Sequence, residues 1–239
     1  MSVPTQSTDA TTEKDAESNS VWKAPFVIIS LGYILARGAN VIFGPAKRDI
    51  ATDLGATLSE VMGSRTTTAL VSAVIIIPAA ILITRLSSGA LAWIGIMLIG
   101  VGKIIIGISP DIEIFYAGAI IASFGSIMLV PLFGQIGRDI LSVRTSVVAT
   151  TIVVVFGRGA QSASLMLTDL VYETIGWRIL YICWGAAMIP VVFLAWRFIK
   201  PTKPTEKVSS VRKLLSMLGW LLKQPLVWMC GISFGLTMA

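Results

Sequence analysis

Long apolar runs separated by short polar segments organise most of this chain. From residue 24 onwards the apolar runs are each about 20 residues long, which is the length a helix needs to cross the hydrocarbon core of a bilayer. Prolines or charged residues end several of them. The pattern predicts six membrane-spanning helices, at residues 24–45, 64–84, 90–109, 112–137, 146–171 and 176–199.

Three further segments flank the predicted six-helix bundle, which we assign to residues 23–200. Residues 1–22 are rich in Ser, Thr, Asp and Glu and predict a disordered cytosolic tail. Residues 201–224 predict a basic cytosolic linker with an amphipathic helix, because leucines recur there at helical spacing among lysines and arginines. Residues 225–239 predict the start of a seventh membrane helix, truncated because the run is too short to span.

The composition agrees with a membrane location. Hydrophobic residues make up 55% of the chain, charged residues 13%, and the mean hydropathy is +0.83; soluble domains carry about 25% charged residues. The fold class predicted is therefore an all-α membrane protein. Cys183 and Cys230 lie in apolar runs and predict buried thiols. The chain has no histidine, so we expect no Ser–His hydrolase, no histidine-bound metal and no histidine proton relay. We also expect no cofactor.

The distribution of basic residues predicts the orientation. With a cytoplasmic N-terminus, the segments on the inner side hold twelve lysines and arginines and those on the outer side hold four. This asymmetry is typical of multi-pass proteins with the N-terminus inside. The net charge of +6 therefore reflects membrane topology and does not indicate a nucleic-acid partner. We expect a multi-pass protein of the cell (plasma or inner) membrane.

Apart from basic residues at the ends of spans, three lie inside predicted spans: Arg37, Arg158 and Lys103. A charge at this depth costs several kcal/mol, on the order of 3 on insertion scales, and normally faces a bundle interior or a wet cavity. Acidic residues are scarce in the spans, so the interior is positively biased. Arginine binds carboxylates and phosphates through a planar fork of donors. The three residues therefore predict a binding site for a small anion.

Each of these residues also has a purely structural interpretation. Lys103 could extend its ammonium to the outer interface, and Arg158 could bond carbonyls of a neighbouring helix. Asn40 and Gln161 lie near the arginines and could contact the ligand, although a hydrogen bond between helices explains each of them as well. Asp169, near the outer end of the fifth predicted helix, is the candidate for a group that couples transport to an ion.

Several stretches resemble the N-terminal half of a major facilitator superfamily transporter. They are DLGATLSE (53–60), SFGSIMLVP (123–131), IGWRILYICWGAAMIPVV (175–192) and LLKQPLVWMCGISFG (221–235). The loop after the second helix departs from the family pattern and keeps Arg85 as the gating-loop residue. In the fourth helix, Ala119 stands where the family has an arginine. An antiporter-type glycine–proline pattern in the fifth helix falls on Ser164-Leu165 and is incomplete.

The resemblance implies secondary active transport by alternating access, with two six-helix halves around a central site. Arg37, eight residues before Pro45, resembles the arginine of the anion:cation symporters and of the cyanate/nitroimidazole-type carriers, where it faces the cavity. By this resemblance the chain holds one half of the transporter, and a second six-helix half is a possible partner. The alternatives are a non-transporting membrane scaffold or sensor, or a half-transporter subunit that needs a partner.

Overall fold

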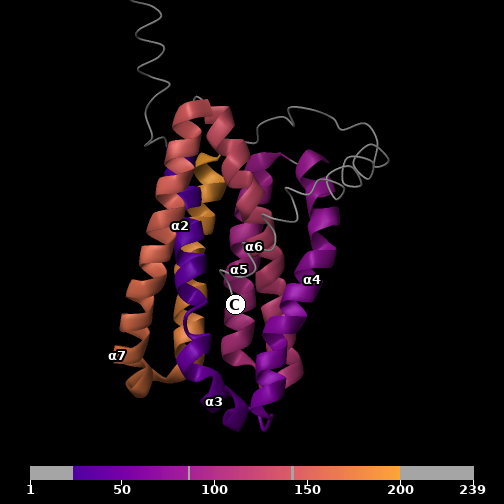
Figure 1. Cartoon of the computed structure of the whole chain (residues 1–239), viewed down its shortest axis with the longest axis vertical. Coiled ribbons are helices and arrows are strands. Elements are labelled where there is room, and N and C mark those ends of the chain that lie inside the picture. The colour runs from indigo at the N-terminus through magenta and orange to yellow at the C-terminus, as the bar shows by residue number, and fades with distance from the viewer. Residues whose placement is uncertain (1–23, 86, 141–142, 200–239) are drawn as a thin grey trace, which may run out of the picture. The chain divides into compact units, whose positions relative to one another are not determined.

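All the secondary structure that the described residues form is helical, which confirms the predicted fold class. The computed structural model describes residues 24–85, 87–140 and 143–199, with no account of the side chains at 24, 76–85, 88, 130, 131, 133–140 and 143–147. The predicted tail, basic linker and seventh helix lie outside these residues. The helices are α2 (Ala24–Ala39), α3 (Phe43–Asp53), α4 (Leu58–Arg85), α5 (Ser88–Ile108), α6 (Ile112–Ile140) and α7 (Val143–Phe198) (Figure 1).

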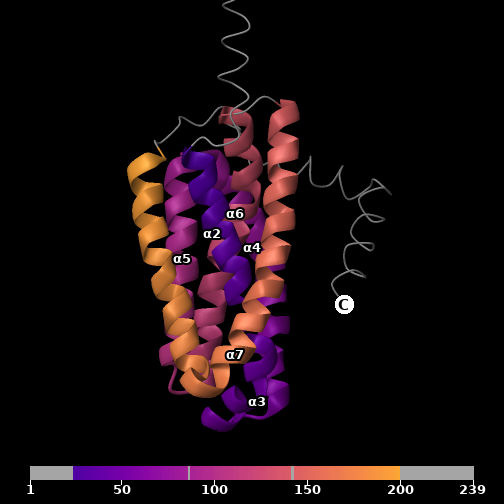
Figure 2. The same cartoon turned by 90° about the vertical axis from the view of Figure 1, so that its left-hand side faces the viewer.

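The element α7 contains both the fifth and the sixth predicted spans. Its backbone leaves helical geometry at Gly176, where φ is 76° and ψ is 164°. A left-handed φ of this kind is accessible to glycine without the steric cost of a Cβ atom. The chain turns back on itself at this point, so the two parts of α7 run in opposite directions (Figure 2).

The prediction of one continuous helix over 24–45 is wrong. α2 ends at Ala39, and α3 begins at Phe43 with its axis turned by 55°. The N–H groups of Asn40 and Val41 bond to carbonyls three residues back, at 3.2 and 3.1 Å, which tightens the last turn and ends the helix. α3 is polar, with Lys47, Arg48, Asp49 and Asp53 in its 11 residues, so it does not continue the apolar run.

The described helices are long and apolar enough for several membrane crossings. Three stretches meet the length and composition of a span among the residues described, and a fourth is added if α2 and α3 form one bent span. The longest of the three, Val148–Phe198, includes the turn at Gly176 and therefore holds two of the predicted helices. Cys183 in this segment is exposed, so the prediction of a buried thiol there is wrong, and Cys230 lies outside the described residues.

Small residues let α5 approach both of its main neighbours. A Cβ atom on Gly102 would lie 2.6 Å from the carbonyl oxygen of Gly118 on α6, and one on Gly100 would lie 3.2 Å from the carbonyl oxygen of Gly185 on α7. Close backbone contact of this kind is how helices pack in lipid, where burial of apolar surface supplies little driving force. Gly118 and Ala122 thus belong to the face of α6 on which α5 packs.

Polar contacts join α3, α5 and α7 at the end of the bundle where α3 lies. Trp177 Nε1 donates to Asp53 at 2.8 Å, the Tyr172 hydroxyl donates to Asp49, and Arg178 donates to the carbonyl of Ser109. Because α3 binds α7 on both sides of Gly176, these contacts hold the turn of α7 against the second half of α3.

Candidate functional site

A pocket of about 100 Å³ lies between the last turns of α2 and the middle of α6. Its walls combine two polar residues of the α2 end with a serine and apolar groups, namely Tyr33, Ala36, Arg37, Asn40, Ser126 and Leu129. Arg37 occupies the last turn of α2, where the partial negative charge of the helix C-terminus favours a cation. The break after Ala39 thus places the arginine at a helix end within the bundle, and not in mid-helix as the apolar run suggested.

The ring of Tyr33 orients the Arg37 guanidinium. Arg37 Nε donates to the Tyr33 hydroxyl at 3.1 Å, and Cζ lies 5.2 Å from the ring centroid. The two terminal NH₂ groups of Arg37 make no hydrogen bond to the described residues. The planar end of the guanidinium is therefore left to meet a ligand that lies in the pocket.

Asn40, one residue past α2, receives hydrogen bonds from two cations of other helices. Lys103 Nζ on α5 donates to Asn40 Oδ1 at 2.9 Å, and an Arg65 NH₂ group on α4 donates to the Asn40 backbone oxygen at 3.0 Å. Asn40 therefore joins three helices, which confirms the interpretation of a hydrogen bond between helices. It also lines the pocket, so both interpretations of this residue remain compatible with its position.

Lys103 does not extend to the interface. The residue is only 6% exposed, and its ammonium lies between Asn40 and the ring of Tyr181, 5.4 Å from the ring centroid. The alternative that it reaches outward from its span is therefore wrong. The short distance to Asn40, made possible by the helix break, gives the ammonium a partner inside the bundle.

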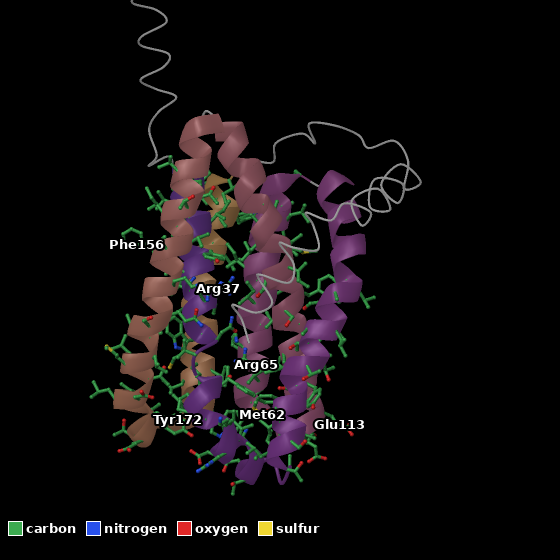
Figure 3. All side chains as sticks on the ribbon, viewed as in Figure 1. Arg37, Met62, Arg65, Glu113, Phe156 and Tyr172 are labelled. Carbon is green, nitrogen blue, oxygen red and sulfur yellow. The ribbon has the colours of Figure 1, made fainter. Side chains whose placement is uncertain are left out.

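The three cations Arg37, Arg65 and Lys103 gather at this place without a carboxylate to balance them. None of them lies within 4 Å of an acidic group of the described residues; the ion pair found in this part of the chain joins Arg178 and Asp53 at 3.9 Å. Lys103 is buried and Arg37 is partly buried, whereas Arg65 is exposed. Cations inside the bundle that lack an acidic partner attract anions strongly, because the surrounding protein screens charge less than water does. Figure 3 shows Arg37 and Arg65 on the inner side of the helices, with Arg65 nearer to α3.

Arg65 is a member of this cluster that sequence reasoning missed. The predicted span 64–84 begins next to Arg65, which puts this residue among the four basic residues of the outer side, whereas α4 begins at Leu58 and includes it. Its guanidinium stacks over the ring of Phe43 at 4.3 Å. A signal was available in the sequence, because Thr57 and Glu60 form a capping box that starts α4 ahead of its apolar part.

The remaining predicted site residues do not line this pocket. Arg158 on α7 is exposed and Gln161 is partly buried, and Asp169 is exposed further along the same helix. Arg85 is the last residue of α4, and its side chain is outside the described part of the chain. The roles of these four residues stay predictions.

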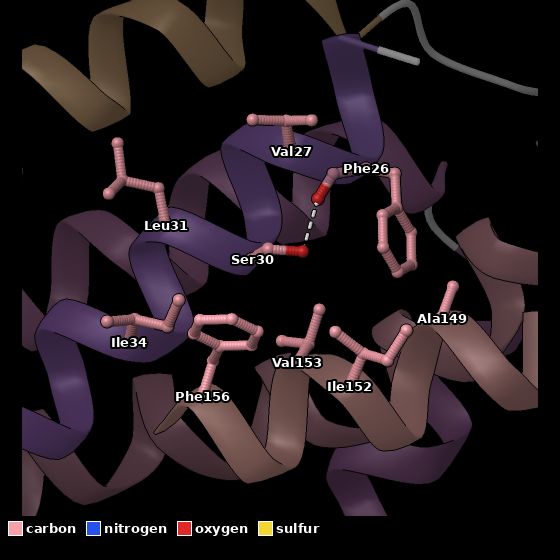
Figure 4. A pocket seen from close by; sticks show the side chains of 9 residues that line it. All are labelled: Phe26, Val27, Ser30, Leu31, Ile34, Ala149, Ile152, Val153 and Phe156. Atoms are coloured by element: carbon pink, nitrogen blue, oxygen red, sulfur yellow. Dashed lines mark hydrogen bonds between the residues drawn. The ribbon is translucent and has the colours of Figure 1, made fainter. Parts of the chain in front are cut away.

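A second pocket, of about 290 Å³, is apolar. It lies between the first half of α2 and the start of α7, and Ser30, which lines it, donates its hydroxyl to the carbonyl of Phe26 at 2.6 Å (Figure 4). Its other lining residues are Phe26, Val27, Leu31, Ile34, Ala149, Ile152, Val153 and Phe156. Because this lining offers no charged group, the second pocket is not a site for an anion.

Comparison with known proteins agrees with the helical bundle. Residues 29–239 match the sequence model of the Major Facilitator Superfamily, which is most of the chain. No curated protein sequence matches the chain significantly. The match covers all of the described helices except the first five residues of α2. The chain therefore belongs to the Major Facilitator Superfamily, a family of membrane transporters.

Proposed function

We propose that this major facilitator protein moves a small anionic solute across the cell membrane by alternating access. The observation that carries the proposal is the pocket at the end of α2, where the terminal NH₂ groups of Arg37 have no protein partner among the described residues. Two further cations, Arg65 and Lys103, lie around the neighbouring Asn40, and no carboxylate of the described residues forms an ion pair with them. The bound anion supplies the missing negative charge.

The break between α2 and α3 supports this assignment. Transporters commonly place substrates and ions at the ends of discontinuous membrane helices, near the interface between two halves of the protein. Here the bend of 55° brings the end of α2 to the pocket. Binding of an anion neutralises Arg37 and lowers the cost of closing the protein around the site. In this proposal a second six-helix half forms the opposite wall.

The coupling of transport is a separate part of the proposal. Symport with a cation needs a group that titrates or binds the ion, and Asp169 is the candidate within this chain. Arg158, Gln161 and Lys103 belong to the substrate path in this proposal, and Arg85 belongs to the gating loop. The branch of anion:cation symporters or of cyanate/nitroimidazole-type carriers fits the position of Arg37 relative to Pro45.

Binding of simple anions to the purified protein in detergent tests the proposal. Sodium nitrate, phosphate, acetate and benzoate serve as probes in calorimetric titrations of the wild-type chain and of Arg37→Lys and Arg37→Ala. We expect at least one anion to bind, and both variants to weaken binding at least tenfold, because lysine keeps the charge and loses the fork. Arg48→Ala, which removes an exposed charge from α3, is the matched control and should bind normally.

The opposite result is equally clear. If no probe binds, or if Arg37→Lys binds as tightly as the wild type, the pocket is not an anion site. If an anion does bind, its uptake into proteoliposomes distinguishes transport from the non-transporting scaffold, since a scaffold binds the solute without moving it.

A further inference from the structure

We propose that Lys103 is a positioning residue that turns the side chain of Asn40 so that its NH₂ group faces the anion in the Arg37 pocket. The inference rests on the proposed function, because it concerns the same pocket. It goes beyond that function by assigning a role to a buried cation that does not itself line the pocket.

The orientation of the Asn40 amide follows from the chemistry of its partner. An ammonium group has three donors and no acceptor, so the amide atom that faces Lys103 Nζ at 2.9 Å must be the oxygen. The oxygen and nitrogen of an asparagine amide are otherwise hard to tell apart. The lysine therefore removes the ambiguity, and the nitrogen lies on the other side of the amide.

The Asn40 nitrogen is left without a protein partner. The hydrogen bonds of Asn40 use its backbone N–H, its backbone oxygen and Oδ1, and within the described residues none uses Nδ2. Among the described residues, no buried side-chain nitrogen or oxygen lacks a hydrogen bond, so Nδ2 is not a buried atom. Since Asn40 lines the pocket, its two amide hydrogens are available to a ligand there.

The pocket then presents donors to its contents from two sides. Arg37 contributes the N–H groups of its two terminal nitrogens, and Asn40 contributes its NH₂. The Ser126 hydroxyl donates its hydrogen to the carbonyl oxygen of Ala122 at 3.0 Å. Such a set of donors suits an anion with at least two oxygen atoms, because one oxygen accepts from the guanidinium while the other accepts from the amide.

Two further contacts hold Lys103 and Asn40 in place. Tyr181 covers the Lys103 ammonium on one side, and Arg65 holds the backbone oxygen of Asn40. Without Lys103 nothing favours one orientation of the amide over the other, and rotation would turn the oxygen toward the anion. An oxygen facing an anion repels it, so the affinity falls.

Stability measurements test the pairing without any anion. Asn40→Asp should raise the thermal unfolding temperature of the protein, because a carboxylate next to Lys103 gains an ion pair that asparagine lacks. Lys103→Met should abolish this gain, so that the two substitutions are non-additive. If Asn40→Asp has the same effect with and without Lys103, the two side chains do not interact and the proposal is overturned.

Anion binding tests the consequence of the pairing. Using whichever of nitrate, phosphate, acetate or benzoate binds the wild type, we expect Lys103→Met to raise Kd about tenfold while the unfolding temperature stays the same or rises. Lys103→Arg, which restores a donor, should recover most of the affinity. A merely structural lysine would instead lower the unfolding temperature and leave the Kd of the folded protein unchanged.

The failure of this inference differs from the failure of the proposed function. If Arg37→Lys weakens binding and Lys103→Met does not, the anion site stands and the positioning role falls. If no anion binds, the function falls, and the stability cycle alone decides whether Lys103 holds Asn40.

Discussion

Gly157 of α7 lies directly against the ring of Tyr33 on α2. A Cβ atom at position 157 would lie 2.8 Å from Tyr33 Cε1 and 3.9 Å from Arg37 Cγ. The absence of a side chain on α7 thus lets the tyrosine occupy the place from which it accepts the hydrogen bond of Arg37 Nε at 3.1 Å. The fifth predicted span therefore contacts the candidate anion site through a glycine that directly precedes the exposed Arg158.

Gly157→Ala should weaken anion binding. The added methyl group displaces the rigid ring of Tyr33, and the ring takes its hydroxyl away from Arg37 Nε. Loss of one hydrogen bond to a charged group is worth about 1.5–3 kcal/mol where it is buried, and this bond is partly buried, so we expect about a tenfold rise in Kd by calorimetric titration. Gly159→Ala is the matched control, because nothing lies within 4 Å of its Cβ position. Equal affinities for both variants would refute the role of Gly157.

Gly102→Ala should destabilise the packing of α5 against α6. Its Cβ would lie 2.5 Å from the backbone nitrogen of Ala122 and 2.6 Å from the carbonyl oxygen of Gly118, and backbone atoms cannot move aside as a flexible side chain can. Overpacking of this kind costs about 1–3 kcal/mol, which a lower thermal unfolding temperature would report. Gly44→Ala, with nothing within 4 Å, should not lower that temperature. If Gly102→Ala is as stable as the wild type, α5 and α6 can move apart at little cost in stability.

Trp177→Phe should loosen the attachment of α3 to the turn of α7. The substitution keeps an aromatic ring against Phe115 and Tyr181, whose centroids lie 6.4 and 6.3 Å away, and removes the N–H that donates to Asp53 at 2.8 Å. Since the bond is only partly buried, we expect a loss of about 1 kcal/mol in the free energy of unfolding. Chemical denaturation in detergent measures it. An unchanged free energy would mean that ring packing alone holds this end of the bundle.

The start of α4 should lose stability in acid. Glu60 accepts hydrogen bonds from the backbone N–H and the hydroxyl of Thr57, at 2.7 and 2.8 Å, and these bonds hold the pKa of the Glu60 carboxyl below its ordinary value of 4.5. Because the folded-state pKa is the lower one, the stabilisation is complete above pH 4.5 and disappears as the pH falls through the folded-state pKa.

Hydrogen exchange at Thr57 measures this dependence. After correction for intrinsic rates, we expect protection of the Thr57 amide to decrease in acid in the wild type. Glu60→Gln keeps an acceptor that does not titrate, so the same amide should show a constant protection over this range. Parallel pH profiles in the two proteins would show that Glu60 does not control the helix start.

The helical class and most helix positions could be predicted from the sequence. Apolar runs of about 20 residues have few stable alternatives, because a backbone in lipid must satisfy its hydrogen bonds within a helix. The turn near Gly176 was expected between the fifth and sixth runs. The sequence also singled out Arg37, since a charge in an apolar run is conspicuous without knowledge of its surroundings.

The tertiary structure alone decided which polar residues meet. Asn40 receives Lys103 from 63 residues away and Arg65 from 25 residues away, and apolar periodicity contains no information about such pairs. The end of α2 at Ala39 was equally invisible, because apolar and small residues continue beyond it to Pro45. Hydropathy determined which segments are helices, since burial in lipid acts on each segment separately. The candidate site depends on contacts between segments, so only the packing of the helices could define it.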